Sequence, residues 1–589
     1  MRKTFTQKIS AVLALISAFT VMGSSCADLL GGVGGHEHSF TKKVQEETYL
    51  KSEATCKDQA VYYYACECGE KGEKTFSAGQ KKQHNFTAEV VEEKYLKNPG
   101  DCLTDAEYFK SCVTCGDRSS STFMVAGAGE HNFKYEVAEG QYLKTEATKT
   151  SPAEYYMSCV CGLASTDATF TYGEPLRTYT EEEKIPYTPT SLTVSLYDAE
   201  NSVYGFTYNT QSKPLRPVIQ VSEGTDFNAD NCIEVAGTVE METSYTTSDR
   251  LMTYYIVKAE VELESSKTYT YRAYDKYVEV GTDEVTMTAR DTASTSFRFA
   301  HVADSQDGVA EFTKVLENVT DTHDFLVHTG DFVENSKYED QWTAMLHGNF
   351  NYLSKIPVMA ISGNHETTYL NGRNETYKHF HHKMPEQETE LGYYYSFTYG
   401  NAKFIMLNTN ISGGSGISNE QYDWLVSELQ NNTATWTIVT MHYPMYSAGR
   451  YGSLPSLKST SEALRKKLHP VFAEYGVDLV LQGHDHVVSR TNAIDINGVP
   501  TSEDWQLVDG LACSVDPQGV IYTMTGTSGT QTRGPVTEAD ATLYRYKLNS
   551  NKSSWTEYEI NGNKMTVTVK YAGTNGVQNY EQWGIVKSA

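Results

Sequence analysis

The chain has 589 residues, which is too long for one hydrophobic core and predicts several domains. Asp and Glu number 75 against 49 Lys and Arg, so the formal net charge is −26. Such a surface repels polyanions and argues against a dedicated nucleic-acid-binding role. Hydrophobic residues make up 39% of the chain and Tyr occurs 42 times, which favours a folded protein with much β-structure.

The first 27 residues have the pattern of an export signal. A basic start precedes an apolar run over residues 9–22, which is short for a membrane span, and small residues lead up to Asp28. Cys26 leaves a second interpretation open, a lipid-modified N-terminus, although the residues before it lack the usual aliphatic residue. The mature chain is therefore expected to be extracellular or held at the cell surface.

Residues 36–180 contain three repeats of about 46 residues. Each repeat has a His-x-Phe motif, a Tyr-Leu-Lys motif and a Cys pair followed by Gly: His38, His84 and His131; Tyr49, Tyr95 and Tyr142; Cys66/Cys68, Cys112/Cys115 and Cys159/Cys161. A further Cys precedes the pair at Cys56 and Cys102, whereas the third repeat has Lys149 there. Units this small bury too little apolar surface to be stable alone, so each needs a metal ion or a disulfide as a cross-link, here called a staple.

Two kinds of staple are consistent with this pattern. The first is zinc, bound by two Cys3His sets: Cys56, Cys66, Cys68 and His84, then Cys102, Cys112, Cys115 and His131. The second is a disulfide, which an oxidising compartment favours, although three Cys per repeat leave an odd thiol. The third repeat, one Cys short, is expected to bind no metal. The units resemble the Cys-rich repeats of bacterial surface proteins, which implies attachment to a cell surface or cell wall.

Residues 186–295 predict an all-β sandwich. Short alternations of polar and apolar residues, such as 192–196 and 254–261, are separated by turn residues. Residues 267–272 resemble a late strand of fibronectin type III domains and of the N-terminal domain of purple acid phosphatases. This domain is expected either to border the active site or to act as a spacer. Cys232 is expected to pair with Cys513 or to remain a buried thiol.

Residues 296–589 alternate strands with helices, which predicts an α/β layered fold of two β-sheets flanked by helices. Apolar residues at helical spacing predict a helix over 310–319. Five apolar runs lead to short polar motifs: Asp304-Ser305-Gln306, Gly330-Asp331, Gly363-Asn364-His365-Glu366, Met441-His442-Tyr443-Pro444 and Gly483-His484-Asp485-His486. Because ligands gather at the carboxyl ends of strands in such sheets, these motifs are expected to converge.

The five motifs, in this order, resemble those of calcineurin-like metallophosphoesterases, and residues 186–589 resemble the purple acid phosphatase branch. The resemblance implies two metal ions and attack of a metal-bound hydroxide on a phosphomonoester. It also implies the role of each residue: Asp304 and His486 on the first metal, Asn364, His442 and His484 on the second, Asp331 on both, and His365 as the catalytic group at the leaving oxygen.

Two positions depart from the family pattern. Glu334 stands where the purple branch has Tyr, so no purple colour is expected, and the metals stay open among Fe, Mn and Zn. Gln306 stands where relatives often have His, and its amide oxygen is expected to bind the first metal or to hydrogen-bond to a ligand. Arg450 is a candidate phosphate contact. The histidines His379, His381 and His382 are expected to be solvated or to touch substrate.

The function predicted from these observations is an exported, dinuclear metal-dependent phosphatase acting on a small phosphate ester. Two alternatives remain open. The same site suits a phosphodiesterase or nucleotidase, and a degenerate site would leave a surface binding protein without activity.

Overall fold

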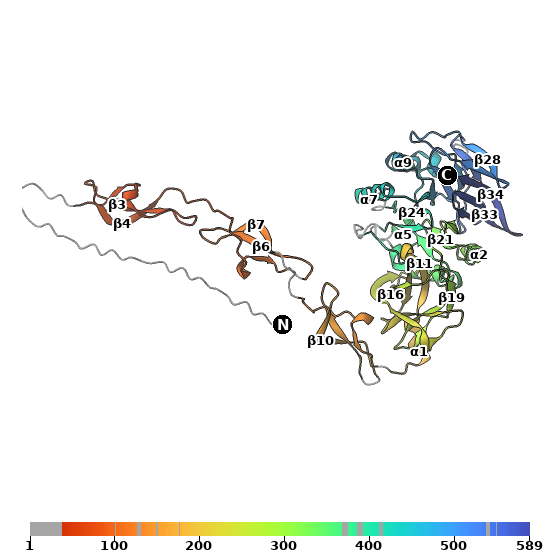
Figure 1. Ribbon diagram of the computed structural model, residues 1–589, viewed down its shortest axis with the longest axis horizontal. Coiled ribbons are helices and arrows are strands. Elements are labelled where there is room, and N and C mark those ends of the chain that lie inside the picture. Colours follow the sequence, from red (N-terminus) through yellow and green to blue (C-terminus); the bar gives the residue numbers. More distant parts are fainter. Residues whose placement is uncertain are drawn as a thin grey trace, which may run out of the picture. The chain divides into compact units, whose positions relative to one another are not determined.

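The computed structural model describes residues 38–100, 102–125, 131–148, 151–175, 177–367, 375–385, 393–410, 416–536, 542–548 and 551–588 (Figure 1). The chain divides into two compact units, Met1–Asn132 and Phe133–Ala589. The predicted export signal, with Cys26, lies outside the described residues. Across the ranges that are described, no helix is both long enough and apolar enough to cross a membrane.

The smaller unit contains the first two repeats, each a small antiparallel sheet. In the first repeat, strand β3 (Ala60–Ala65) pairs with three others: β1 (Lys42–Lys43), β2 (Leu50–Ser52) and β4 (Lys71–Ala78). In the second repeat the order is β5-β6-β7: β5 (Leu96–Asn98), β6 (Ala106–Ser111) and β7 (Arg118–Val125). Sheets of three or four short strands bury little apolar surface, so they depend on additional cross-links.

The Tyr-Leu-Lys motif supports the turn that carries each Cys pair. The Tyr hydroxyl donates to the carbonyl of the Gly after the pair: Tyr49 to Gly69 (2.8 Å), Tyr95 to Gly116 (2.7 Å) and Tyr142 to Gly162 (2.9 Å). At Gly116 the backbone φ is +72°, in the left-handed region that favours glycine. The repeated Tyr and Gly therefore stabilise the same turn.

The third repeat belongs to the larger unit, although the sequence grouped it with the other two repeats. Its sheet has the order β10-β9-β8: β8 (Leu143–Thr145), β9 (Ala153–Ser158) and β10 (Ala164–Tyr172). Tyr155 on β9 is 1% exposed and accepts a 2.9 Å hydrogen bond from Arg216 of the following domain. The Ala147 amide donates to the Tyr277 hydroxyl at 3.0 Å. These contacts join the third repeat to the next domain.

Residues 190–288 form two antiparallel sheets. The first has the order β11-β12-β16-β15: β11 (Thr190–Asp198), β12 (Val203–Thr210), β16 (Leu251–Glu262) and β15 (Thr238–Tyr245). The second has the order β14-β13-β17-β18, with β19 beside β17: β14 (Ile233–Ala236), β13 (Pro217–Glu223), β17 (Thr268–Asp275), β18 (Val280–Gly281) and β19 (Val285–Thr288). Phe206 and Tyr271 meet edge to face between the sheets, with ring centroids 4.9 Å apart. Cys232 and Cys513 are both free thiols.

The remaining residues form the predicted α/β layered fold, which confirms the fold class. The first large sheet has the order β22-β21-β20-β32-β33-β34-β29-β28: β22 (Val358–Ala360), β21 (Phe325–His328), β20 (Ser296–Val302), β32 (Ser554–Asn561), β33 (Lys564–Gly573), β34 (Gly576–Val586), β29 (Leu511–Val515) and β28 (Asp504–Val508). The second has the order β23-β24-β25-β26-β30-β27-β31: β23 (Tyr395–Tyr399), β24 (Ala402–Met406), β25 (Trp436–Met441), β26 (Leu479–Gln482), β30 (Ile521–Thr525), β27 (Val488–Thr491) and β31 (Tyr544–Leu548).

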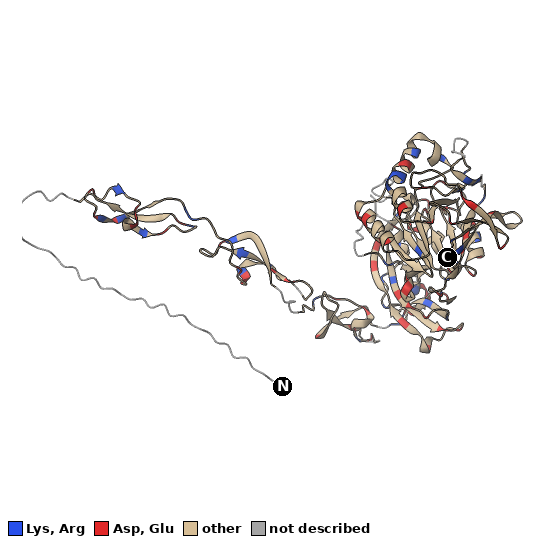
Figure 2. Ribbon diagram, turned by 45° about the horizontal axis from the view of Figure 1, so that its top comes forward, with Lys and Arg blue, Asp and Glu red and all other residues tan. Residues whose placement is uncertain are grey.

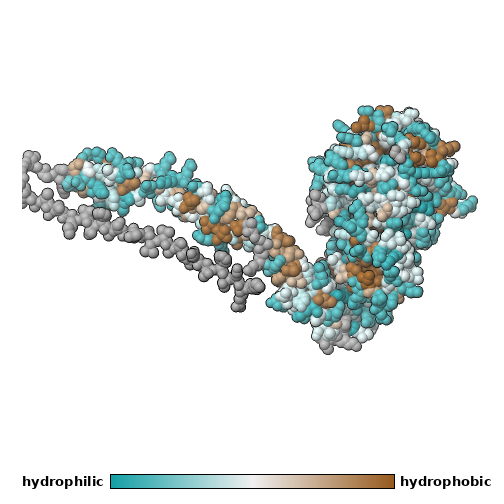
Figure 3. All heavy atoms as spheres, viewed as in Figure 1, coloured by the Kyte–Doolittle hydropathy of each residue, from teal (hydrophilic) through white to brown (hydrophobic). Residues whose placement is uncertain are grey.

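The two large sheets pack face to face around aromatic side chains. Phe299 on β20 stacks on Tyr558 at 4.7 Å and meets Phe404 of the second sheet edge to face at 5.1 Å. Helix α2 (Val309–Val319) covers the outer face of the first sheet. Helices α7 (Asn419–Gln430) and α9 (Pro455–Glu474) cover that of the second. In the view of Figure 3, most of the larger unit's surface is hydrophilic, as this burial of apolar residues requires.

Candidate metal centre

The predicted ligands follow the ends of parallel strands. Strands β20, β21 and β22 run parallel, and so do β24, β25, β26 and β30. Each predicted ligand lies just past one of these ends: Asp304 and Gln306 after β20, Asp331 after β21, Asn364 at the start of α5 (Asn364–Thr367) after β22, His442 after β25, and His484 and His486 after β26. Parallel strands bring their carboxyl ends to one edge, so the motifs converge there.

Four side chains meet around one point, as the second-metal set requires. His442 Nε2 lies 3.1 Å from Asn364 Oδ1, 3.1 Å from His484 Nδ1 and 3.2 Å from Asp331 Oδ2. Donor atoms bound to one ion at roughly 2.0–2.2 Å lie roughly 3.0–3.4 Å from one another. The spacing of these donors, of which Asp331 and His442 are buried, therefore fits a shared cation.

Asp304, His486 and Gln306 form a second group. His486 Nε2 lies 3.4 Å from Asp304 Oδ1. The amide oxygen of Gln306 is buried and has no hydrogen-bond partner among the described residues, while its nitrogen lies 3.2 Å from His365 Nε2. Burying a carbonyl oxygen unpaired costs free energy. A cation beside this oxygen would supply the missing partner, so the observation fits Gln306 as a ligand.

The backbone is strained at five of these positions. The φ angles are +54° at Asp304, +42° at Gln306, +57° at Asp331, +74° at His484 and +54° at His486. A non-glycine residue in this left-handed region costs on the order of 1 kcal/mol or more. The surrounding fold therefore holds these side chains inward at a cost in conformational free energy, which is typical of a functional site.

Two histidines of the second set have opposite protonation. Burial alone lowers the pKa of His442, but the carboxylates of Asp331 and Asp304 raise that pKa to about 9. The pKa of His484 is held well below its ordinary value by burial and by the charge on His442. Burial raises the pKa of Asp331, yet His442 and its neighbours bring it well below the usual range. The carboxylates thus attract positive charge, and a cation competes with a proton at His442.

Backbone carbonyls fix the orientation of three imidazoles. Nδ1 of His442 contacts the Thr329 carbonyl at 2.7 Å, Nδ1 of His486 contacts that of Gln531, and Nδ1 of His365 contacts that of Glu334. A protonated Nδ1 leaves Nε2 as the atom facing the centre. Such outer partners set the tautomer of a ligand histidine.

Glu366 holds the two loops together, a role that the sequence analysis did not assign. Its carboxylate accepts from the amides of Gly363 (2.7 Å), Asp331 (2.8 Å) and Phe332 (2.9 Å). Burial raises the pKa of Glu366 to about 7. At Gly363 a Cβ atom would lie 2.0 Å from Asp331 Oδ1, so only glycine fits. The one available signal was that Glu directly follows the Asn-His pair.

Two arginines lie beside the candidate centre. Arg450 Nε is 3.5 Å from Asp485 Oδ1, a carboxylate that also accepts from the Tyr451 amide at 2.9 Å. Arg533 is part-buried, with its amide 3.3 Å from the His486 carbonyl and Nη1 3.5 Å from the His484 carbonyl. Arg450 is thus committed to Asp485. No sequence motif indicated Arg533, because it is a single Arg in a loop that lies far along the chain from the motifs of most predicted ligands.

Of the three histidines expected to be solvated or to touch substrate, His379 and His382 are buried and His381 is half-buried. His379 is buried against Trp342 at 4.1 Å, and its carbonyl accepts from Thr193 of β11 at 2.7 Å. His382 Nε2 contacts the Val358 carbonyl at 2.9 Å. His381 contacts Glu260 of β16 at 3.2 Å. The segment instead joins the sandwich to the large sheets, which apolarity patterns could not reveal.

In the repeats, the structure groups the Cys and His residues differently from the prediction. Cys66 and Cys68 lie with His38, not with Cys56 and His84. Cys112 and Cys115 lie with Cys56 and His84, rather than forming the predicted set with Cys102 and His131. The reason is that the Cys preceding the pair in the first repeat faces the second repeat.

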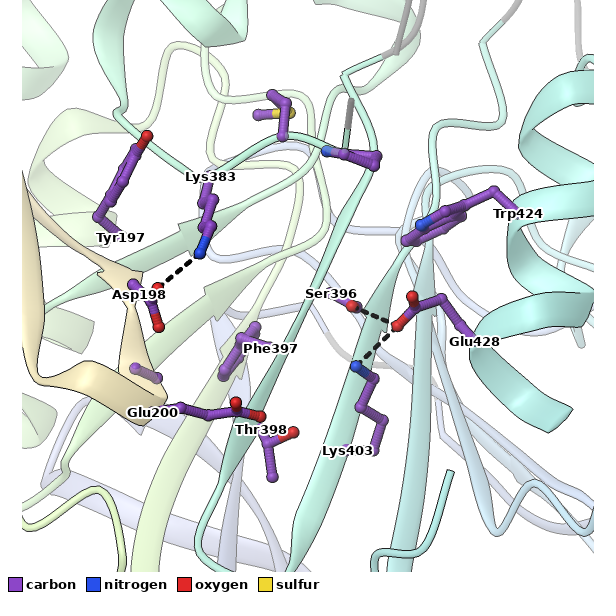
Figure 4. A pocket seen from close by; sticks show the side chains of 13 residues that line it. Tyr197, Asp198, Glu200, Lys383, Ser396, Phe397, Thr398, Lys403, Trp424 and Glu428 are labelled. Carbon is purple, nitrogen blue, oxygen red and sulfur yellow. Dashed lines mark hydrogen bonds and ion pairs between the residues drawn. The ribbon is translucent and has the colours of Figure 1, made fainter. Parts of the chain in front are cut away.

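A separate pocket of about 230 Å³ lies where the sandwich meets the second large sheet (Figure 4). Four of its charged groups form two pairs: Lys383 with Asp198 at 2.6 Å, and Lys403 with Glu428 at 2.7 Å. Glu428 also accepts from Ser396 Oγ at 2.6 Å. None of the lining residues belongs to the candidate metal centre, so this pocket contributes nothing to it.

Comparison with known proteins agrees with the geometry. The calcineurin-like phosphoesterase family matches residues 297–488. Purple acid phosphatase 15 of Arabidopsis thaliana is 28% identical over 210 residues, which is 34% of this chain and 35% of that protein. Acid phosphatase type 7 of Mus musculus is 28% identical over 229 residues, 35% of this chain and 48% of that protein. The chain thus spans about a third to a half of the length of these relatives.

A solved structure shows the same fold. Purple acid phosphatase PPD1 from yellow lupin (Lupinus luteus) seeds superposes with a TM-score of 0.58 and 18% identity, covering 68% of this chain and 75% of that one.

Proposed function

The chain contains a calcineurin-like phosphoesterase domain with similarity to purple acid phosphatases, and from this premise we propose that the protein is an exported metal-dependent phosphomonoesterase. The observation that carries the proposal is the meeting of His442 Nε2 with Asn364, His484 and Asp331 at 3.1–3.2 Å. Export rests on the basic and apolar pattern of residues 1–27. The substrate class is a small phosphate monoester.

The site residues form ligand sets for two cations. Asp304, Gln306 and His486 would hold the first, Asn364, His442 and His484 would hold the second, and Asp331 would contribute to both. Two such ions, when bound, neutralise a phosphate and lower the pKa of a bound water towards about 7. Their identity is open among Fe, Mn and Zn. One relative is named Fe(3+)-Zn(2+) purple acid phosphatase 12, and Glu334 in place of Tyr predicts a protein without the purple colour here.

His365 acts at the leaving group. Its Nδ1 is held by the Glu334 carbonyl, and its Nε2 lies 3.8 Å from Asp331 Oδ2 and 3.2 Å from Gln306 Nε2. Nε2 therefore faces the centre, where the doubly protonated ring donates a proton or a hydrogen bond from it to the departing oxygen. Arg533 adds positive charge at the rim, which favours a dianionic substrate.

The test measures metal content together with turnover of nitrophenyl phosphate and bis-nitrophenyl phosphate. Asp331→Ala and His442→Ala are expected to lose metal and to lower monoester turnover by roughly 10³-fold or more. His347→Ala, an exposed His elsewhere, is the matched control. Faster turnover of the diester assigns a diesterase, and a purified protein that neither binds metal nor turns over either ester contradicts catalysis.

A further inference from the structure

We propose that Cys56, His84, Cys112 and Cys115 bind one zinc ion that joins the first repeat to the second. Cys56 belongs to the first repeat, and the other three residues belong to the second. The ligand atoms of all four lie within 4.8 Å of one another. This set differs from the phosphoesterase ligands in residue type and in place, so it concerns a separate site.

The spacings between the ligand atoms fit a tetrahedral ion. Sγ of Cys56 is 3.7 Å from Sγ of Cys112, and Sγ of Cys115 is 3.3 Å from Nδ1 of His84. A zinc ion with bonds of about 2.3 Å to sulfur and about 2.0 Å to nitrogen spaces two sulfurs roughly 3.8 Å apart, and sulfur and nitrogen roughly 3.5 Å apart. A disulfide requires about 2.05 Å, so the Cys56–Cys112 pair is held apart as two thiols.

Backbone hydrogen bonds hold the segments that carry these four residues next to one another. The Lys82 amide donates to the Thr55 carbonyl at 3.0 Å, which ties the segment before His84 to the residue before Cys56. The Val113 amide donates to the Asn85 carbonyl at 3.0 Å, which ties the residue after His84 to the residue after Cys112. His84 is thus anchored on both sides, so binding of an ion requires little further ordering of this residue.

Neighbouring side chains complete the site. Phe86 stacks on the His84 ring at 5.1 Å, which explains the His-x-Phe motif. Lys57 of the first repeat pairs with Asp117 of the second at 2.7 Å. The Gly116 amide donates to the Cys112 carbonyl at 2.9 Å, which closes the tight turn between Cys112 and Cys115.

A zinc shared between repeats also accounts for the irregular Cys count. Among the described residues, the first repeat brings His38 together with Cys66 and Cys68, a set of three. The third repeat has Lys149 at the position of Cys56, and no fourth repeat follows it. Cys56, which precedes the pair of the first repeat, is then a ligand offered to the second repeat and not an odd thiol.

The test uses the full chain loaded with Co²⁺, whose thiolate bonds give a charge-transfer absorption that the sulfur-free phosphoesterase ligands do not give. Cys56→Ser and Cys112→Ser are each expected to lose one metal ion per chain, with a smaller absorption. The double variant is expected to lose the same single ion. Cys232→Ser, a thiol outside every metal cluster among the described residues, is the control and is expected to lose none.

The outcomes separate the groupings. Loss of two ions in the Cys56→Ser/Cys112→Ser double variant would place the two residues in different sites and overturn the proposal. So would the absence of any thiolate absorption, or a Cys56–Cys112 disulfide found by mass spectrometry in the native protein. His84→Cys, which keeps four soft ligands, is expected to retain the ion with a stronger absorption. Nitrophenyl phosphate turnover is expected to be unchanged in all these variants, so failure here is distinct from failure of the phosphatase proposal.

Discussion

A histidine acts as a ligand or as an acid according to how close the fold holds its available nitrogen to the other donors. In His442 and His365 the Nδ1 atom is held by a backbone carbonyl, so Nε2 faces the centre in both. His442 Nε2 lies among three donors at 3.1–3.2 Å, whereas His365 Nε2 stands off at 3.8 Å from Asp331. The same side chain is therefore positioned for two different tasks.

Replacing His365 tests its task at the leaving oxygen. His365→Asn is expected to lower kcat for phenyl phosphate by roughly 10²-fold, because a poor leaving group needs a proton. For dinitrophenyl phosphate, whose leaving group needs none, the loss is expected to be smaller by about tenfold or more. The measurement is kcat for both substrates, with metal content as a check. Equal losses on both esters would assign His365 to structure or metal binding instead.

At the scale of elements, the centre depends on the loops that follow β21 and β22. Glu366 joins them by accepting three backbone amides from Gly363, Asp331 and Phe332. The loops would otherwise leave those amides buried and unpaired, which costs free energy. Strand order brings the loops near each other, but this carboxylate sets their spacing.

Glu366→Gln measures that contribution. The amide group of Gln presents an NH₂ to at least one backbone N–H, so a hydrogen bond is replaced by two facing donors. The free energy of unfolding is expected to fall by about 2–3 kcal/mol, and metal affinity with it. Urea unfolding and metal titration are the measurements. Glu334→Gln removes the same charge at a half-buried neighbour, where the Gln oxygen can still accept from Gln531 Nε2, and serves as the control for loss of a carboxylate. An unchanged stability in Glu366→Gln would contradict the role of Glu366 in joining the loops.

The contact between the sandwich and helix α3 (Glu339–Leu346) contains a buried acid. Glu339 accepts from Asn209 Nδ2 of β12 at 2.8 Å and lies 3.6 Å from His379. Burial raises the pKa of Glu339 to about 8, with Glu375 adding to the rise and Lys378 opposing it. The element contact is therefore sensitive to pH.

The sign of this effect follows from proton linkage. Between about 4.5, the ordinary pKa, and about 8, the folded protein keeps a proton on Glu339 that the unfolded chain releases. The free energy of unfolding is thus expected to fall as pH rises through this window, by up to a few kcal/mol. Glu339→Gln keeps the acceptor for Asn209 and removes the charge, so its stability is expected to be flatter over pH 5–8. Parallel curves for the two proteins in urea unfolding would contradict the assignment.

At the scale of the whole molecule, the repeats and the catalytic domain are stabilised in different ways. The larger unit has extended apolar clusters between its sheets, whereas the first two repeats have little apolar surface to bury. Acidic residues occur in both units (Figure 2), in keeping with the net charge of −26. The third repeat is an intermediate case, since Tyr155 and Tyr277 belong to a core shared with the sandwich.

Removing that shared contact tests whether the third repeat depends on the sandwich. Tyr155→Ala deletes a buried aromatic ring and the acceptor for Arg216, a loss of roughly 3–5 kcal/mol. Faster proteolysis within residues 133–180 is expected, with phosphatase turnover retained, because the candidate centre is built from later residues. Cleavage rates and nitrophenyl phosphate turnover are the measurements. Tyr156→Ala, at the neighbouring half-buried position, is the control, and equal protection in both variants would contradict the dependence.

Local pattern was sufficient for the elements and for the class of fold. Apolar spacing predicted α2, and the strands that lead to Asp304, Asp331 and His442 were read from runs of apolar residues. These features depend on residues close together in the chain, so they can be predicted from a single sequence. The convergence of the five motifs was predictable too, because strand order in this family places their ends at one edge.

Other features were decided only by tertiary contacts between distant residues. The regrouping of Cys56 with Cys112, the docking of the third repeat through Tyr155, and the burial of His379 against Trp342 each join segments with no shared local pattern. Glu366 and Arg533 gained their places in the same way. Residue type and spacing state which chemistry a side chain offers, but packing in three dimensions selects its partner.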